Sequence, residues 1–282
     1  MLHNADVGFF YGETGICVLA GLVFIYIAMT KTPLCMRPYR NNLMNLGMWY
    51  FIAAITDGFV FQPVFVSHDS RPCIAAYGVA SLIHERSVNV CWTLILFTSS
   101  NCGIAICLHA FFRYCQMSTG RILEFLKRNM PAFMVAAHAL NTIVVVAMGV
   151  LSTLHMIEAV FEDKVWICFP IDSPLVNIIM GSMFAIAVIC TLVLVLLLFL
   201  VIKSVRQQLT IVSTKTYQLQ KSLALNVIVL TILPIVFDII PLCIMIVTLL
   251  LNTPDANVFF FLGAHLCLNG NCTHIPRCFE KL

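Results

Sequence analysis

The sequence predicts an all-α membrane protein, a bundle of seven transmembrane helices with its N-terminus outside and its C-terminus inside. Three observations lead to this fold class. Of the 282 residues, 61% are apolar and only 10% are charged, too few charges to coat a water-soluble domain. Seven apolar stretches approach the roughly 20 residues that a helix needs to cross a bilayer. Finally, the cations gather in alternate connecting segments.

The seven stretches are expected to form one transmembrane domain that covers residues 1–282. The first has aromatic residues at its start and no basic region or cleavage site of a signal peptide before it, so it is expected to be retained as a helix. The third, fourth and fifth contain no Asp, Glu, Lys or Arg, and the seventh is the shortest, ending before Pro276 and Arg277. The expected spans are about 10–30, 43–66, 88–112, 131–156, 177–202, 222–251 and 258–275.

The orientation follows from the connecting segments, because Lys and Arg favour the cytoplasmic side. The basic stretch "KTPLCMRPYRNN" (Lys31 to Asn42) follows the first span, and two prolines interrupt the helices there. Other segments are acidic or balanced, such as the one after the fourth span, which has four acids and one lysine. The cations that indicate the inner side are Lys31, Arg37, Arg40, Arg113, Arg121, Lys127, Arg128, Lys203, Arg206, Lys215 and Lys221.

Several motifs resemble the nematode serpentine chemoreceptors, particularly their class H and class I groups, and they occur in the same order over almost the whole chain. The resemblance implies a seven-helix, GPCR-like receptor that senses external chemicals in sensory neurons. The motifs are "KTPLCMRPYRNNLMNLGMW" (Lys31 to Trp49), "QPV" (Gln62 to Val64), "AAY" (Ala75 to Tyr77), "FFRY" (Phe111 to Tyr114), "KTYQLQK" (Lys215 to Lys221), Pro234 with Pro241, and "GAH" (Gly263 to His265).

The resemblance also implies where a G protein would bind. Arg113, at the inner end of the third span, offers five hydrogen-bond donors to whatever docks there; the alternative is a cation that merely reaches the headgroups. No acid occurs between Lys203 and Lys221, so only a neutral partner such as Gln218 or Gln220 is available from that segment. The expected coupling residues are Arg113, Tyr114, Gln220 and Lys221.

Two acids lie within the expected spans, and a charged one at the bilayer centre is costly. Asp57 is expected either to hold a sodium ion or waters near mid-membrane, as in many seven-helix receptors, or to be a protonated carboxyl bonded to a neighbouring helix. Asp238 lies between Pro234 and Pro241, and prolines there favour a bend that acts as a hinge. Helix geometry alone suggests a ligand pocket that draws on Trp92, Phe97, Asn101 and Met183.

A disulfide is expected on the outer side, which is oxidising. Cys168, after the fourth span, has two candidate partners, Cys73 in the preceding outer segment and Cys91 about one turn into the third span. Receptors of the wider class tie these regions together. The pairing stays open between the two, and free thiols are the alternative.

No catalytic set is found, and the chain is not expected to be an enzyme. His109, His138 and His155 lie isolated in apolar spans and are interpreted as packed or hydrogen-bonded residues. The C-terminal "HLCLNGNCTHIPRC" matches no zinc spacing, so no metal and no cofactor are expected. The net charge of +3 is spread among separate segments and indicates no nucleic-acid surface.

The favoured function is a chemosensory receptor that binds an external small molecule and activates a heterotrimeric G protein. It would be a multi-pass protein of the plasma membrane, in the cilium of a sensory neuron. The alternatives are a multi-span transporter or channel, or a non-signalling relic of the receptor family with a shortened seventh helix. The absence of an internal duplication argues against the transporter.

Overall fold

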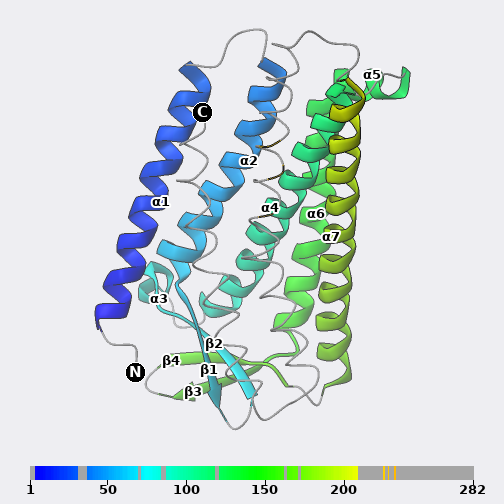
Figure 1. Ribbon diagram of the computed structural model, residues 1–282. Coiled ribbons are helices and arrows are strands. Elements are labelled where there is room, and N and C mark those ends of the chain that lie inside the picture. The colour runs from blue at the N-terminus through cyan, green and yellow to red at the C-terminus, as the bar shows by residue number, and fades with distance from the viewer. Residues whose placement is uncertain are drawn as a thin grey trace.

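The structure is a computed structural model that describes residues 4–30, 37–68, 71–83, 87–117, 121–161, 164–170 and 173–208, with three single positions beyond them at 225, 228 and 232. Long helices run side by side, a small sheet crosses one end of them, and a short helix projects from the other end (Figure 1). The N-terminal end of the first helix lies at the sheet end.

The long helices follow the apolar stretches of the sequence. They are α1 (Asn4–Thr30), α2 (Arg37–Ile55), α4 (Ser87–Met117), α6 (Met130–Thr153) and α7 (Pro174–Gln208). Within the described residues, four segments are long and apolar enough to cross a bilayer, namely Tyr39–Phe61, Ser87–Gln116, Met130–Thr153 and Pro174–Gln207, and Thr14–Thr30 is a shorter apolar helix. The predicted spans 222–251 and 258–275 lie outside the described residues.

α4 is the central helix of the described bundle. It packs against α2, α6 and α7, while α1 packs against α2. At these contacts the buried residues include Ala53 and Ala54 of α2 and Ala105 and Ala110 of α4. Small residues at such positions allow the helix backbones to approach closely.

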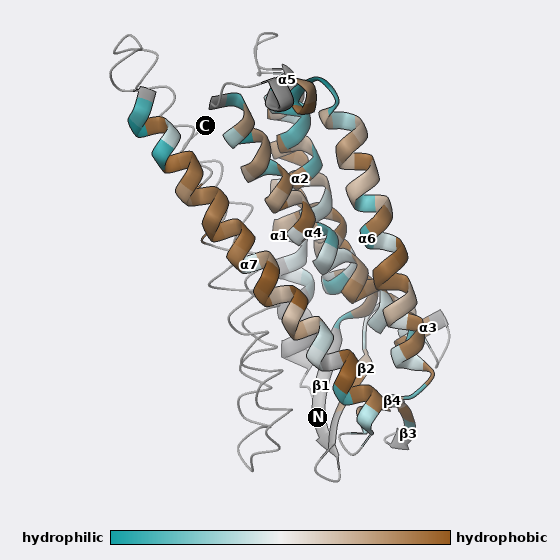
Figure 2. Cartoon of the chain, turned by 90° about the vertical axis from the view of Figure 1, so that its right-hand side faces the viewer, coloured by the Kyte–Doolittle hydropathy of each residue, from teal (hydrophilic) through white to brown (hydrophobic). Residues whose placement is uncertain are grey.

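The outer surface of the bundle is apolar, as lipid requires. Large apolar side chains such as Leu140 and Ile143 of α6 and Leu192 and Phe199 of α7 are exposed. Apolar residues follow one another along most of α7 (Figure 2). In a soluble protein such a surface would aggregate, whereas in a bilayer it is the face that contacts acyl chains.

The second helix ends earlier than the sequence predicts. After Ile55 it widens into a π-helical turn, η2 (Thr56–Phe61), and Gln62 then takes a left-handed conformation with φ of 41°. The next residue, Pro63, begins strand β1 (Pro63–His68). Because a residue before proline avoids the helical region, residues 63–66 form a strand and not the last turn of the span.

The sheet joins two segments that are far apart in the chain. Strands β1 and β2 (Arg71–Ala76) form one hairpin, and β3 (Ile157–Phe161) and β4 (Lys164–Cys168) form the other. The order is β1-β2-β4-β3, and β2 pairs antiparallel with β4, Cys73 opposite Cys168 and Ile74 opposite Ile167. The connection after α2 is therefore fixed to the connection after α6.

Two short helices complete the described chain. α3 (Val79–Ile83) follows β2, and α5 (Arg121–Arg128) connects α4 to α6 at the end opposite the sheet. Pro38 lies in the first turn of α2 and not in a loop, because the N–H that proline lacks would have no helical partner there.

We predict that Gly78→Ala destabilises the fold while Gly103→Ala does not. A Cβ at position 78 would lie 2.6 Å from the carbonyl carbon of Val60 and 2.8 Å from the carbonyl oxygen of Phe59, both backbone atoms that cannot rotate away. Overpacking of this kind costs about 1–3 kcal/mol. Position 103 in α4 has nothing within 4 Å, so alanine there gains up to about 1 kcal/mol of helix propensity.

Thermal unfolding of the two purified variants in detergent measures the difference. A Gly78→Ala protein that unfolds at the wild-type temperature would contradict the close backbone approach between Gly78, which follows β2, and η2.

Candidate functional site

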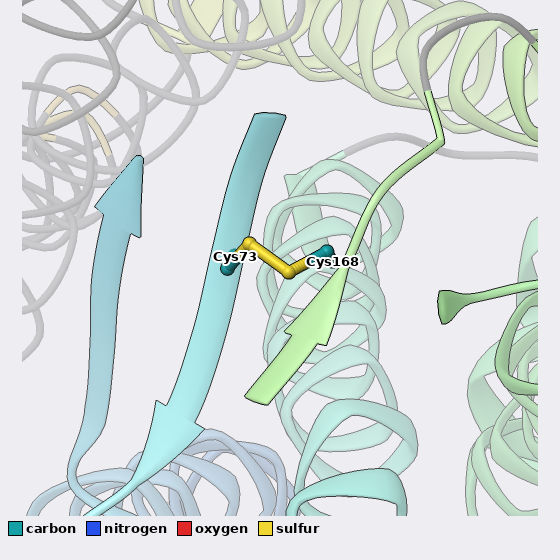
Figure 3. Close-up of a disulfide and its surroundings, with 2 residues drawn as sticks. All are labelled: Cys73 and Cys168. Atoms are coloured by element: carbon teal, nitrogen blue, oxygen red, sulfur yellow. A yellow bond between two sulfur atoms is a disulfide. The ribbon is translucent and has the colours of Figure 1, made fainter. Parts of the chain in front are cut away.

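The sheet end of the bundle is held by a disulfide. Cys73 of β2 and Cys168 of β4 are bonded, with Cα atoms 4.0 Å apart, and Figure 3 shows the bond crossing between the two adjacent strands. Cys91, the other candidate partner in the sequence, is a buried free thiol on α4. The bond joins directly opposed residues of the register, so it fixes the two hairpins to each other covalently.

Side chains of β2 and β4 alternate between two faces. Ile74 and Ile167 join the apolar cluster over the ends of the helices, whereas Cys73, Trp166 and Cys168 form a separate small cluster. This is the period of two that a strand imposes. The cluster that contains Ile74 and Ile167 therefore fills the space between the sheet and α4, and it is called the apolar plug below.

Trp92 of α4 lies at the centre of this plug. Its indole N–H donates to the Ser152 hydroxyl of α6 at 3.0 Å, and that hydroxyl donates to the Gly149 carbonyl at 2.8 Å. The Phe169 ring stands edge-on to the indole with 5.1 Å between ring centroids. Met183 of α7 packs against the same cluster. Two of the four residues suggested for a ligand pocket are thus brought together.

Asn101 and Phe97, the other two, belong to a second, deeper group. Asn101 lies nine residues after Trp92 on α4, about 13 Å along the helix axis. The Trp49 indole N–H of α2 donates to His138 Nε2 of α6 at 3.2 Å, and His138 Nδ1 lies 2.7 Å from Asn101 Oδ1. Since Nε2 accepts, Nδ1 carries the hydrogen and donates to the amide oxygen.

Both polar atoms of the Asn101 amide are engaged in hydrogen bonds within the bundle, one of them in this Trp49–His138–Asn101 relay. Its Oδ1 accepts from His138, its Nδ2 donates to the Phe97 carbonyl at 2.9 Å, and its side chain is fully buried. The Phe97 ring packs edge-on against Trp49 with centroids 5.6 Å apart. The relay connects α2, α4 and α6 in the interior of the bundle, so in this conformation Asn101 holds the bundle together.

Asp57 lies in the π-helical turn η2, about one turn before the helix ends at Phe61. It is buried, and the Thr98 hydroxyl of α4 is hydrogen-bonded to its carboxyl group. Within the described part of the chain, Asp57 Oδ1 and Gln62 Oε1 have no hydrogen-bond partner. The sequence does not predict the π-helical turn around Asp57, because such a turn has no signature in an apolar stretch.

The opposite end of α4 carries Arg113 inside the bundle. The side chain is 3% exposed, and its Nη1 donates to Gln116 Oε1 at 2.9 Å. One turn earlier, buried His109 is hydrogen-bonded through Nδ1 to the Asn42 side chain of α2 at 3.2 Å. The guanidinium is therefore covered, and in this conformation it does not offer its donors to a docking protein.

The remaining coupling and hinge residues divide between α4 and the undescribed part of the chain. Tyr114 packs against Val201 and Val205 near the end of α7, so α4 and α7 are in contact at the end of the bundle opposite the sheet. The predicted residues Gln220, Lys221, Pro234, Asp238 and Pro241 lie outside the described residues.

Sequence reasoning treated the histidines singly and did not find their partners. His138 and His109 are hydrogen-bonded to Asn101, Trp49 and Asn42 on other helices. A usable signal was present, because polar residues within apolar spans must find partners across helices. The sequence does not indicate which pairs form, because that depends on helix rotation.

A bundle with a lipid-compatible surface, a sheet at one end and a buried arginine at the other matches the class of seven-transmembrane receptors. The family model of the serpentine type 7TM GPCR chemoreceptor Srh matches residues 13–273. The chain therefore belongs to the Srh family of serpentine chemoreceptors, which agrees with the motifs of the first inner segment and of α4. No curated protein matches the chain.

We predict that removing the disulfide lowers stability by the same amount from either side. Cys73→Ser and Cys168→Ser, singly or together, each release a loop closed over a sequence separation of 95 residues, which is worth about 2–5 kcal/mol. Cys190→Ser, a half-buried free thiol on α7, is the matched control. Thermal unfolding with and without reductant measures the effect, and a wild-type protein insensitive to reductant would contradict it.

A double-mutant cycle tests the relay. Trp49→Phe and His138→Phe should each destabilise by about 1 kcal/mol, with a coupling of about 0.6–1.7 kcal/mol between them, because either change breaks the same hydrogen bond. His155→Phe is the control, since exposed His155 is bonded to the Leu151 carbonyl of its own turn. Unfolding in detergent is the measurement, and strictly additive effects of the first two changes would refute the bond.

Proposed function

We propose that this chain is a chemosensory receptor that binds an external small molecule at the sheet end and activates a heterotrimeric G protein at the opposite end. The observation that carries the proposal is that one uninterrupted helix, α4, contains both Trp92 beneath the sheet and Arg113 at the other end. They are 21 residues apart, about 32 Å along the axis. Any ligand that shifts the sheet end of α4 also shifts Arg113.

The proposed orientation has the N-terminus and the sheet outside. Two independent kinds of chemistry support it. A disulfide forms and persists in an oxidising compartment, and this one lies at the sheet end together with the start of α1. Cations such as Arg40, Lys127 and Lys203 belong to the opposite ends of the helices, as expected for the cytoplasmic side. The membrane would be the plasma membrane of a sensory neuron, at its cilium.

The proposed ligand site is the apolar cluster under the sheet that contains Trp92 and against which Met183 packs. Phe97 extends it inward. Asn101 is assigned a different role, that of fixing the relay, because its amide is already hydrogen-bonded on both sides. A ligand acts by binding one arrangement of the helices better than another.

For Asp57 the proposal is the protonated carboxyl and not the sodium site. The Thr98 hydroxyl lies 3.0 Å from the Leu94 carbonyl and 3.1 Å from the Ile95 carbonyl, so its hydrogen is used within α4. Its oxygen then accepts, and a protonated Asp57 is the donor that fits. A neutral acid also avoids the cost of a buried charge.

The proposed resting state keeps Arg113 inside the bundle, bonded to Gln116. Activation then requires the guanidinium to leave this position and meet the G protein, together with Tyr114, Gln220 and Lys221. The hinge at Pro234 and Pro241, with Asp238 between them, is proposed from the sequence as the bend that lets the sixth helix move aside.

We expect Gln116→Ala to raise basal G-protein signalling and Arg113→Ala to abolish it, both at normal surface level. The first change removes the acceptor that holds Arg113 at 2.9 Å, and the second removes the docking cation. A G-protein biosensor in transfected cells measures both without knowledge of the ligand, with epitope staining to normalise expression.

Arg206→Ala is the matched control, because Arg206 is an exposed cation at the same end of the bundle, on α7. Arg113→Lys, which retains the charge, distinguishes loss of docking from misfolding. Basal signalling that stays unchanged in Arg113→Ala at equal surface level would refute the coupling role.

A further inference from the structure

Helix α5 is divided into an apolar half and a charged half, a pattern that the proposed receptor mechanism does not use. In "RILEFLKR" the four apolar residues fall on one side by helical register, and Arg121, Glu124, Lys127 and Arg128 fall on the other. Phe125 is 66% exposed. In water this large ring would remain uncovered, so the helix has the composition of one that lies at an apolar boundary.

The junction with α6 fixes how α5 is held. A single residue, Asn129, separates the two helices, and both its backbone N–H and its side-chain amide donate to the Phe125 carbonyl, at 3.1 and 3.0 Å. The Asn129 carbonyl in turn accepts from the Phe133 N–H at 3.0 Å. These bonds join the last turn of α5 to the first turn of α6, so α5 has little freedom to rotate away.

The direction in which α5 points is the second observation. It projects sideways from the end of the bundle, across the direction of the long helices (Figure 1). The segment of α6 that is long and apolar enough to cross a bilayer begins at Met130. A helix joined to that segment by one residue is therefore expected at the level of the headgroups. Its far end extends sideways beyond the ends of the long helices (Figure 1).

The charge of α5 selects the kind of lipid. Three cations against one acid give it a net charge of +2, and Lys127 and Arg128 both lie in the last turn. Basic residues beside a span attract anionic headgroups. Zwitterionic headgroups offer no comparable net charge.

We infer that α5 is an interfacial anchor whose apolar side, including Phe125, enters the headgroup and acyl-chain boundary while Lys127 and Arg128 bind anionic phospholipid headgroups. In the proposed orientation this is the cytoplasmic leaflet, where such lipids are concentrated. In this proposal α5 binds the lipids that surround the receptor, and this binding does not require a ligand.

The test uses the full-length receptor in lipid nanodiscs, with the variant Phe125→Trp. Discs contain phosphatidylcholine alone, or phosphatidylcholine and phosphatidylserine at about 7:3, and each is also made with phosphatidylcholine brominated near the headgroup end of its chains. The fluorescence that the introduced indole adds over the wild-type protein should be quenched at least about twofold by bromine and little by aqueous acrylamide. Leu196→Trp, on the exposed face of α7, is the positive control.

A second comparison tests whether the charge of the headgroup is recognised. Phosphatidylserine should increase bromine quenching of the indole introduced by Phe125→Trp, and adding Arg128→Glu should remove that increase. Arg206→Glu, the same charge change on α7, should retain it. Size-exclusion profiles identical to wild type show that each variant is folded.

Two outcomes would overturn the inference. Emission quenched by acrylamide and not by bromine would show α5 in water, available to a cytosolic protein such as a G protein. Bromine quenching that is equal with and without phosphatidylserine, and insensitive to Arg128→Glu, would show apolar insertion without recognition of anionic lipid.

Discussion

The constraint on which this structure depends is that lipid cannot hydrogen-bond, so a polar group within the bundle must find a partner in the protein. In the described helices, pairings of this kind tie α4 to its neighbours at several levels. Trp92 bonds to Ser152, Asn101 accepts from His138, and His109 meets Asn42. They occur near the sheet, in the interior and near the opposite end, so the polar residues of α4 specify how the neighbouring helices are rotated around it.

The two ends of the bundle are stabilised differently. At the sheet end, one covalent bond and two hairpins fix the connections after α2 and α6 to each other, and the apolar plug beneath them covers Trp92. At the other end of the described bundle, Arg113 is bonded to Gln116 and Tyr114 packs against α7. The described residues at this end can therefore rearrange by changing non-covalent contacts alone, whereas the sheet end is closed by a covalent bond.

How much the sequence predicts differs between elements. The expected spans 88–112, 131–156 and 177–202 each lie largely within one helix, because long uncharged apolar stretches have no other stable arrangement in lipid. For residues 63–66 the predicted helix is wrong, since apolar valines suit both a strand and a span, and Pro63 is the local signal that the helix ends. Burial of Arg113 and the Asn101–His138 bond depend on which faces of two helices meet. Helix rotation of this kind cannot be read from a single sequence.

The Trp49–His138–Asn101 relay holds α4 near its midpoint, which affects how the helix can tilt. Asn101 lies 14 residues after Ser87 and 16 before Met117, close to the midpoint of a rod about 46 Å long. A rod clamped at its midpoint turns about that fulcrum, so a small tilt imposed at one tip produces an equal and opposite displacement at the other. Chemical variation near the tip beneath the sheet can then change how far the opposite tip moves without any alteration of the residues there.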